Sequence, residues 1–189
     1  MKRELQLLNV MSALFVFALG LLGPIYATYV AGIGGDMITT GTAYSIFAIA
    51  SGALTFLLSR WENRSKHKAR IMMYGFALGC IGILGYLFVS NPLELFAVQL
   101  VLGIAAAIRM PLYDALYSTY LDKGKYTAEW GAWEALNLIV TGLSALLGGM
   151  IAEWYGFNTL FALMFAVSLI GFFMSAALPT KKPKKRPRK

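Results

Sequence analysis

The chain has 189 residues, of which 58% are hydrophobic and only 14% are charged. A soluble domain would carry about a quarter charged residues, so the composition excludes an ordinary water-soluble globular protein. The formal net charge of +8 would suit a nucleic-acid partner, but the basic residues gather between long apolar stretches, and that distribution favours a membrane protein.

Six apolar segments follow one another along the chain, each about as long as a membrane-spanning helix. They cover residues 7–32, 39–59, 70–89, 93–120, 128–154 and 157–178. None alternates with a period of two as a barrel strand does, and in lipid only a helix satisfies every backbone group within one segment. We therefore predict an all-α integral membrane protein, with six transmembrane helices within residues 1–179 and a basic cytoplasmic tail over residues 180–189.

The first segment has an alternative interpretation as a secretory signal peptide, because Lys2 and Arg3 precede it. Its apolar run is longer than a signal peptide allows, and no A-x-A cleavage site ends it. We therefore predict that it is the first span. Pro24 in this segment and Pro111 in the fourth each remove a backbone hydrogen bond, so we expect a kink at both positions.

The distribution of basic residues predicts the orientation of the chain. With six spans, sixteen of the seventeen Lys and Arg residues fall on one side, and Arg109 is the exception. The positive-inside rule then places both termini in the cytoplasm. The ending KKPKKRPRK resembles a nuclear-localisation or nucleic-acid patch. We interpret it instead as a topology anchor near anionic headgroups, and we predict no nucleic-acid partner.

Arg109 lies deep inside the fourth apolar segment, about 11 residues or roughly 16 Å from its cytoplasmic end. Insertion scales put the cost of an arginine at such depth at about 2.5–3.5 kcal/mol. Arg109 should therefore face the bundle interior or a wet cavity, and it should have a partner. Two acids are candidates: Asp114, about 140° around the same helix, and Glu134 in the fifth segment.

Two stripes of polar and aromatic residues favour a path through the bundle. The fifth segment places on one face Trp130, Glu134, Asn137 and Thr141. The fourth places on the face of Arg109 the residues Tyr113, Tyr117 and Tyr120. Two interpretations remain open. Arg109 and Glu134 form a structural pair, or Arg109 attracts an anionic substrate while Glu134 or Asp114 takes up a proton.

Nothing in the sequence indicates catalysis. The only histidine, His67, lies in a basic loop, and the sequence holds no H-E-x-x-H, G-x-S-x-G, P-loop or dinucleotide fingerprint. The acids of the apolar segments have no histidine or cysteine cluster with which to bind a metal. We therefore predict that the protein is not an enzyme and uses neither a metal nor another cofactor.

Several stretches carry a resemblance to a known family. The first segment ends GPIYATYVAGIGG, the loop after the second reads SRWENRSKHKAR, and EWYGFNTLF joins the fifth to the sixth. In order, spacing and topology these are similar to one half of a major facilitator superfamily transporter, over about residues 8–178. The family's loop motif is G-x-x-x-D-R-x-G-R-R. Here Asn63 takes the place of the Asp, while Arg64 and Lys68 keep the basic character. In the fourth segment, Gln99 stands where the family often has an arginine.

The resemblance implies a fold and a function. Family members usually have twelve helices, in two six-helix halves around a cavity that the first and fourth helix of each half line. Those helices carry Tyr26, Tyr29, Arg109 and Tyr113 here. We therefore expect a multi-pass protein of the cell membrane that transports a small molecule as a parallel homodimer. The alternative is a non-transporting scaffold, or a subunit of a split transporter that needs a different half.

Overall fold

The computed structural model describes residues 3–178, and every regular element in this part of the chain is a helix. In chain order the elements are α1 (Arg3–Gly20), the 3₁₀ turn η1 (Gly23–Ile25), α2 (Tyr26–Gly32), α3 (Met37–Arg64), α4 (Lys68–Gly85), the 3₁₀ turn η2 (Tyr86–Phe88), α5 (Pro92–Tyr120) and α6 (Tyr126–Ala176). Five stretches of the described chain are long and apolar enough to span a membrane. The predicted basic tail, residues 180–189, lies outside the described residues.

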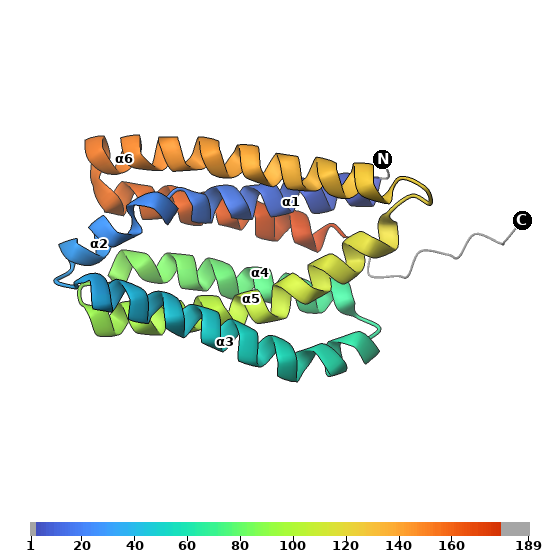
Figure 1. Ribbon diagram of the computed structural model, residues 1–189, viewed down its shortest axis with the longest axis horizontal. Coiled ribbons are helices and arrows are strands. Elements are labelled where there is room, and N and C mark those ends of the chain that lie inside the picture. The colour runs from blue at the N-terminus through green and yellow to red at the C-terminus, as the bar shows by residue number, and fades with distance from the viewer. Residues whose placement is uncertain (1–2, 179–189) are drawn as a thin grey trace, which may run out of the picture.

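The helices form two layers (Figure 1). One layer contains α1, α2 and α6, and the other contains α3, α4 and α5. Packing of α4 against α6 joins the layers, whereas α1 and α5 make few direct contacts. The two layers therefore hold α1 and α5 opposite one another without closing the space between them.

The predicted kink at Pro24 is confirmed. The helical hydrogen bonds of α1 end near Leu22, whose N–H donates to the Leu19 carbonyl at 3.3 Å. Pro24 has no N–H to donate, and the chain continues through η1 before α2 begins. Pro111 does not break its helix, because α5 runs through that proline as one helix, and the kink expected there stays a prediction.

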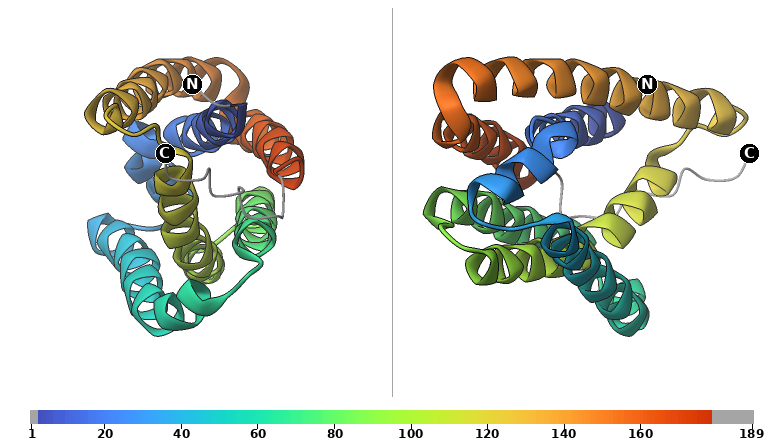
Figure 2. Two further views of the ribbon diagram at one scale, coloured as in Figure 1. Left: turned by 90° about the vertical axis from the view of Figure 1, so that its right-hand side faces the viewer. Right: turned by 60° about the vertical axis from the view of Figure 1, so that its left-hand side comes forward.

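The last helix is long because two helices join at a turn. As one rod, the 51 residues of α6 would measure about 77 Å, more than twice the roughly 30 Å of a hydrocarbon core. Gly156 interrupts it with φ 79° and ψ 168°, a conformation that glycine adopts without a steric penalty. Figures 1 and 2 show the chain reversing direction there. We call residues 126–155 the first arm of α6 and residues 157–176 its second arm.

The basic loops gather at one end of the bundle. The loop between α3 and α4 and the loop between α5 and α6 lie at the same end as the start of α1 (Figure 1). The second arm of α6 also ends there. Both described ends of the chain therefore lie on the side that carries the basic loops.

Candidate functional site

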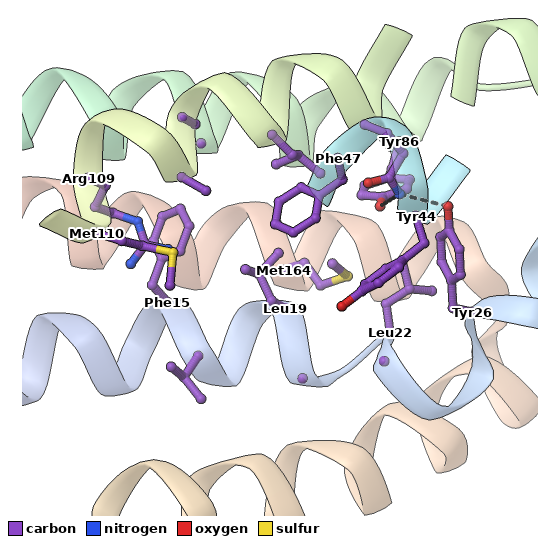
Figure 3. A pocket seen from close by; sticks show the side chains of 18 of the residues that line it. Phe15, Leu19, Leu22, Tyr26, Tyr44, Phe47, Tyr86, Arg109, Met110 and Met164 are labelled. Carbon is purple, nitrogen blue, oxygen red and sulfur yellow. Dashed lines mark hydrogen bonds between the residues drawn. The ribbon is translucent and has the colours of Figure 1, made fainter. Parts of the chain in front are cut away.

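A cavity of about 530 Å³ lies between α1 and α5 (Figure 3). This volume falls within the range of about 300–1,000 Å³ that is common for small-molecule sites. Most of the wall is apolar. The residues that line it include Phe15, Leu19, Leu22 and Tyr26 from the first two helices, Tyr44 and Phe47 from α3, Gln99, Leu102, Ala105, Ala106, Arg109 and Met110 from α5, and Thr141 and Met164 from the two arms of α6. Met110 and Tyr44 remain 52% and 66% exposed, so the cavity is open on one side.

Arg109 lies at one end of the cavity against two aromatic rings. Its guanidinium carbon is 4.6 Å from the centre of the Phe15 ring and 5.0 Å from that of Phe76. The two rings meet edge to face, with centres 5.1 Å apart. A cation over an aromatic face gains roughly 0.5–2 kcal/mol. The two rings therefore offset a large part of the cost of holding this cation at bilayer depth.

Two glycines of α4 make room for this arrangement. A Cβ at Gly75 would lie 3.0 Å from the backbone nitrogen of Arg109, and a Cβ at Gly79 would lie 2.5 Å from the Phe15 ring. The two glycines are one helical turn apart, so they lie on the same face of α4. Because this face of α4 carries no side chains at the two glycines, α5 and the Phe15 ring of α1 can approach it closely. The side chain of Arg109 is enclosed as a result.

Replacing Gly75 by alanine should lower the midpoint of thermal unfolding, because the new methyl group meets the α5 backbone. Overpacking of this kind costs about 1–3 kcal/mol. Gly41→Ala is the matched control, because a Cβ there meets nothing within 4 Å. Unfolding of both variants in detergent checks the prediction, and an equal midpoint for the two would contradict it.

A hydrogen-bonded group lies at the other end of the cavity. The Gln99 Nε2 amide donates to the hydroxyl oxygens of Tyr26, at 2.7 Å, and Tyr86, at 3.0 Å (Figure 3). Both hydrogens of the Gln99 amide group are used in this way. The Gln99 carbonyl and the tyrosine O–H hydrogens keep their capacity to bind a further polar group.

Within residues 3–178 the structure shows no ion pair or hydrogen bond of the Arg109 guanidinium, and the acid whose charge acts on it is Asp114 of the same helix. Glu134 is exposed on the first arm of α6, and Asp114 is exposed further along α5. The structural pair of Arg109 with Glu134, one of the two interpretations of the sequence, is therefore not formed. The cation lines the cavity with its N–H groups free of any described protein acceptor.

With this geometry established, comparison with known proteins identifies the family. A family model described as Major Facilitator Superfamily matches residues 8–189. The chain belongs to the Major Facilitator Superfamily. This confirms the resemblance inferred from the loop and turn motifs, and it makes the protein a multi-pass membrane protein of a transporter family.

Two relatives differ in how much of their own length this chain matches. It is 24% identical over 166 residues to "Uncharacterized MFS-type transporter YitZ" of Bacillus subtilis (strain 168), covering 87% of this chain and 98% of that protein. It is 27% identical over 155 residues to "Quinolone resistance protein NorB" of Staphylococcus aureus (strain JH9), covering 79% of this chain and 32% of that protein. The chain thus matches nearly all of one relative and about a third of the other.

Two of the tyrosines predicted to line a path pack instead in an aromatic cluster. In this superfamily member the rings of Tyr113 and Tyr117 stack with centres 5.8 Å apart, against Trp130 and Trp133 of α6. The Tyr113 hydroxyl donates to the Leu8 carbonyl at 3.3 Å. The cluster joins α5 to the first arm of α6 near their connecting loop, and Tyr113 and Tyr117 lie outside the cavity wall.

Tyr29 and Asn137 also lie away from the cavity wall. Tyr29 is 4% exposed and packs on Tyr86, Phe157 and Phe161. Asn137 is partly buried on the first arm of α6, with no hydrogen bond to either amide atom within the described part of the chain. Of the predicted pathway residues, Arg109 and Tyr26 line the cavity.

The loop between α3 and α4 contains a residue that the sequence reasoning did not single out. Asn63 and Arg64 are exposed at the end of α3, and Lys68 Nζ donates to the Glu62 carbonyl at 2.9 Å. The Glu62 side chain itself is 2% exposed, and neither carboxylate oxygen has a hydrogen bond within residues 3–178. The family motif has an Asp at the position of Asn63, and Glu62 is the acid directly before it. This position in the sequence could have indicated Glu62.

Proposed function

We propose that this chain is one half of a secondary active transporter, which moves a small solute by alternating access between two six-helix units. The observation that carries the proposal is the open cavity between α1 and α5. It has the volume of a solute site, yet one bundle forms only part of its wall. The family of the chain supports the same conclusion.

The proposal includes six membrane crossings with both termini in the cytoplasm. The two arms of α6 run in opposite directions from Gly156, and each is long enough to cross a hydrocarbon core of roughly 30 Å. The basic loops at one end of the bundle support a cytoplasmic position for that end under the positive-inside rule. The same rule supports a cytoplasmic position for the basic tail, residues 180–189.

A second copy of the chain is the proposed other half. The rims of the cavity opening come from α3, through Tyr44 and Phe47, and from the first arm of α6, through Thr141. Large apolar side chains remain exposed on both, among them Ile49 and Phe56 on α3 and Leu143 and Leu146 on α6. Two copies inserted in the same direction can be related by an axis along the membrane normal. That axis would place α3 of each copy against the first arm of α6 of the other.

The dimer can be tested with paired cysteines. In Ala48→Cys/Ala145→Cys, each site lies one helical turn from a residue that lines the cavity, Tyr44 on α3 and Thr141 on α6, and neither side chain is buried. The proposed axis brings these faces of the two copies together, so a short bifunctional thiol reagent should give a cross-linked dimer in native membranes. Ile81→Cys/Ala145→Cys is the control, because Ile81 is 60% exposed on α4, away from the cavity rims. Equal cross-linking of the two pairs would argue against this interface.

Alternating access itself is testable without a known substrate. Met110→Cys places a thiol on the exposed cavity wall, whereas the native Cys80 is buried. A membrane-impermeant thiol reagent should label Met110→Cys from both sides, in right-side-out and in inside-out vesicles. Ile81→Cys should be labelled from neither side, because its proposed surroundings are lipid. Labelling of Met110→Cys from one side alone would contradict alternating access.

A second candidate function is a non-transporting subunit of a split transporter. The observation that favours it is Asn63, which replaces the acid of the family's loop motif and is exposed in the structure. Such a subunit would pair with a different chain. It would therefore fail the cysteine cross-linking test when expressed alone.

A further inference from the structure

The cavity has two polar ends and an apolar middle. Gln99 and Arg109 are ten residues apart on α5, which places them about 15 Å apart along the helix axis. Figure 3 shows Arg109 and Tyr26 at opposite ends, with Phe47, Leu19 and Met164 between them. A ligand that uses both ends must therefore be long and apolar in its middle.

The end formed by Arg109 selects for a carboxylate. The aromatic rings of Phe15 and Phe76 fix the guanidinium but accept no conventional hydrogen bond from it. Within residues 3–178 the cation has neither an ion pair nor a hydrogen-bond acceptor, and the charge of Asp114 acts on it from outside the cavity wall. The planar guanidinium presents paired N–H donors that match the two oxygens of a carboxylate. A cationic ligand would meet the same charge and be repelled.

The end formed by Gln99 selects for a neutral polar group. The Tyr26 hydroxyl accepts a hydrogen bond from Gln99, so its own hydrogen is left to donate. The Gln99 carbonyl is left to accept. A hydroxyl group on the ligand can satisfy both, whereas a second carboxylate would meet no cation there.

We infer that the cavity binds an elongated amphipathic organic anion, with its carboxylate on Arg109, its apolar body along α5 and a neutral hydroxyl on Gln99 and Tyr26. The cavity volume of about 530 Å³ is far larger than a small inorganic anion needs. The inference names the substrate class for the proposed transport function and rests on that function.

A matched set of probes tests both ends of the site. The first probe is a biphenyl with a carboxylate at one end and a hydroxyl at the other. The second replaces the carboxylate by a carboxamide, and the third lacks the hydroxyl. Each is titrated calorimetrically into the full chain in lipid nanodiscs. The wild type should bind the first probe about 10- to 100-fold more tightly than the carboxamide, because a hydrogen bond to a charged group is lost.

Variants then assign each preference to a residue. Arg109→Gln should remove the preference for carboxylate over carboxamide and leave the preference for the hydroxyl. Gln99→Leu or Tyr26→Phe should do the reverse. Arg60→Gln is the control for general charge, because Arg60 is exposed at the end of α3 and outside the cavity. The comparison of the first two probes on the wild type tests the preference for a carboxylate even where a variant fails to fold.

Each remaining outcome separates the inference from the proposed function. Equal binding of carboxylate and carboxamide by the wild type would overturn the inference, as would an equal loss in Arg60→Gln and Arg109→Gln. Movement of the carboxamide across proteoliposomes as fast as the carboxylate would also overturn it and leave transport intact. Arg109-dependent binding without any movement across the membrane would leave the site standing and overturn the transport function.

Discussion

Arg109→Ala should reduce uptake of the carboxylate probe into proteoliposomes by at least about tenfold at low probe concentration. Arg109 is the one basic residue among the described residues that line the cavity. Removing it deletes hydrogen bonds to a charged ligand group that are worth about 1.5–3 kcal/mol, which corresponds to about 10- to 100-fold in binding. It also removes the positive charge that attracts an anion into the cavity.

Arg109→Lys separates charge from geometry in the same assay. Lysine keeps the charge, but it is a compact ammonium that stacks less well on Phe15 and Phe76 and cannot bind a carboxylate through a planar fork. Uptake by this variant should fall between the wild type and Arg109→Ala. Arg60→Ala should behave as the wild type, because Arg60 is exposed outside the cavity. Intact uptake by Arg109→Ala would show that the cation has no part in handling the solute.

The helices and their breaks could be predicted from the sequence because their causes are local. An apolar run of membrane length, a proline at position 24 and a glycine at position 156 each act within a few residues. The structure is helical along the predicted apolar segments, with the break at Gly23–Ile25 and the reversal at Gly156. At Pro111, by contrast, α5 continues as one helix, so this proline does not end it.

The surroundings of Arg109 depend on which helices become neighbours, and no local pattern states that. A period of 3.6 residues correctly places Arg109 and Tyr113 on neighbouring positions of one helix face. It does not say that one lines a cavity while the other packs on Trp133. The glycines of α4 that admit Phe15 and the α5 backbone are ordinary small residues in the sequence. Their effect arises when three helices meet.

The same distinction applies to Gln99. The family resemblance shows only that Gln99 stands in place of an arginine. It does not say which residues Gln99 contacts. Its contacts with Tyr26 and Tyr86 join residues up to 73 positions apart. The sequence alone therefore gave no reason to place Gln99 in the site.

We propose that one of two acids, Glu134 or Asp114, takes up the proton that accompanies the solute, so one of the two variants Glu134→Gln and Asp114→Asn should abolish accumulation driven by a pH gradient. Glu134 lies seven residues from Thr141, two helical turns along the same face of the first arm of α6, and Thr141 lines the cavity. Asp114 lies one turn beyond Met110, which lines the cavity from α5. Both carboxylates therefore extend the cavity faces of opposite walls, at the end where Arg109 lies. They are exposed in one bundle, and the proposed second copy would enclose them.

The coupling is measured by comparing two modes of transport of the carboxylate probe. Uptake against a concentration gradient, driven by an imposed pH difference, should fall to the level of empty liposomes in the variant that loses the coupling acid. Exchange of internal for external probe should continue, because it needs the solute site but no net proton movement. Glu153→Gln is the matched control, since Glu153 is exposed near the opposite end of the same arm of α6. Gradient-driven accumulation that survives in both Glu134→Gln and Asp114→Asn would assign energy coupling to other groups, and Arg109 would then act on the solute alone.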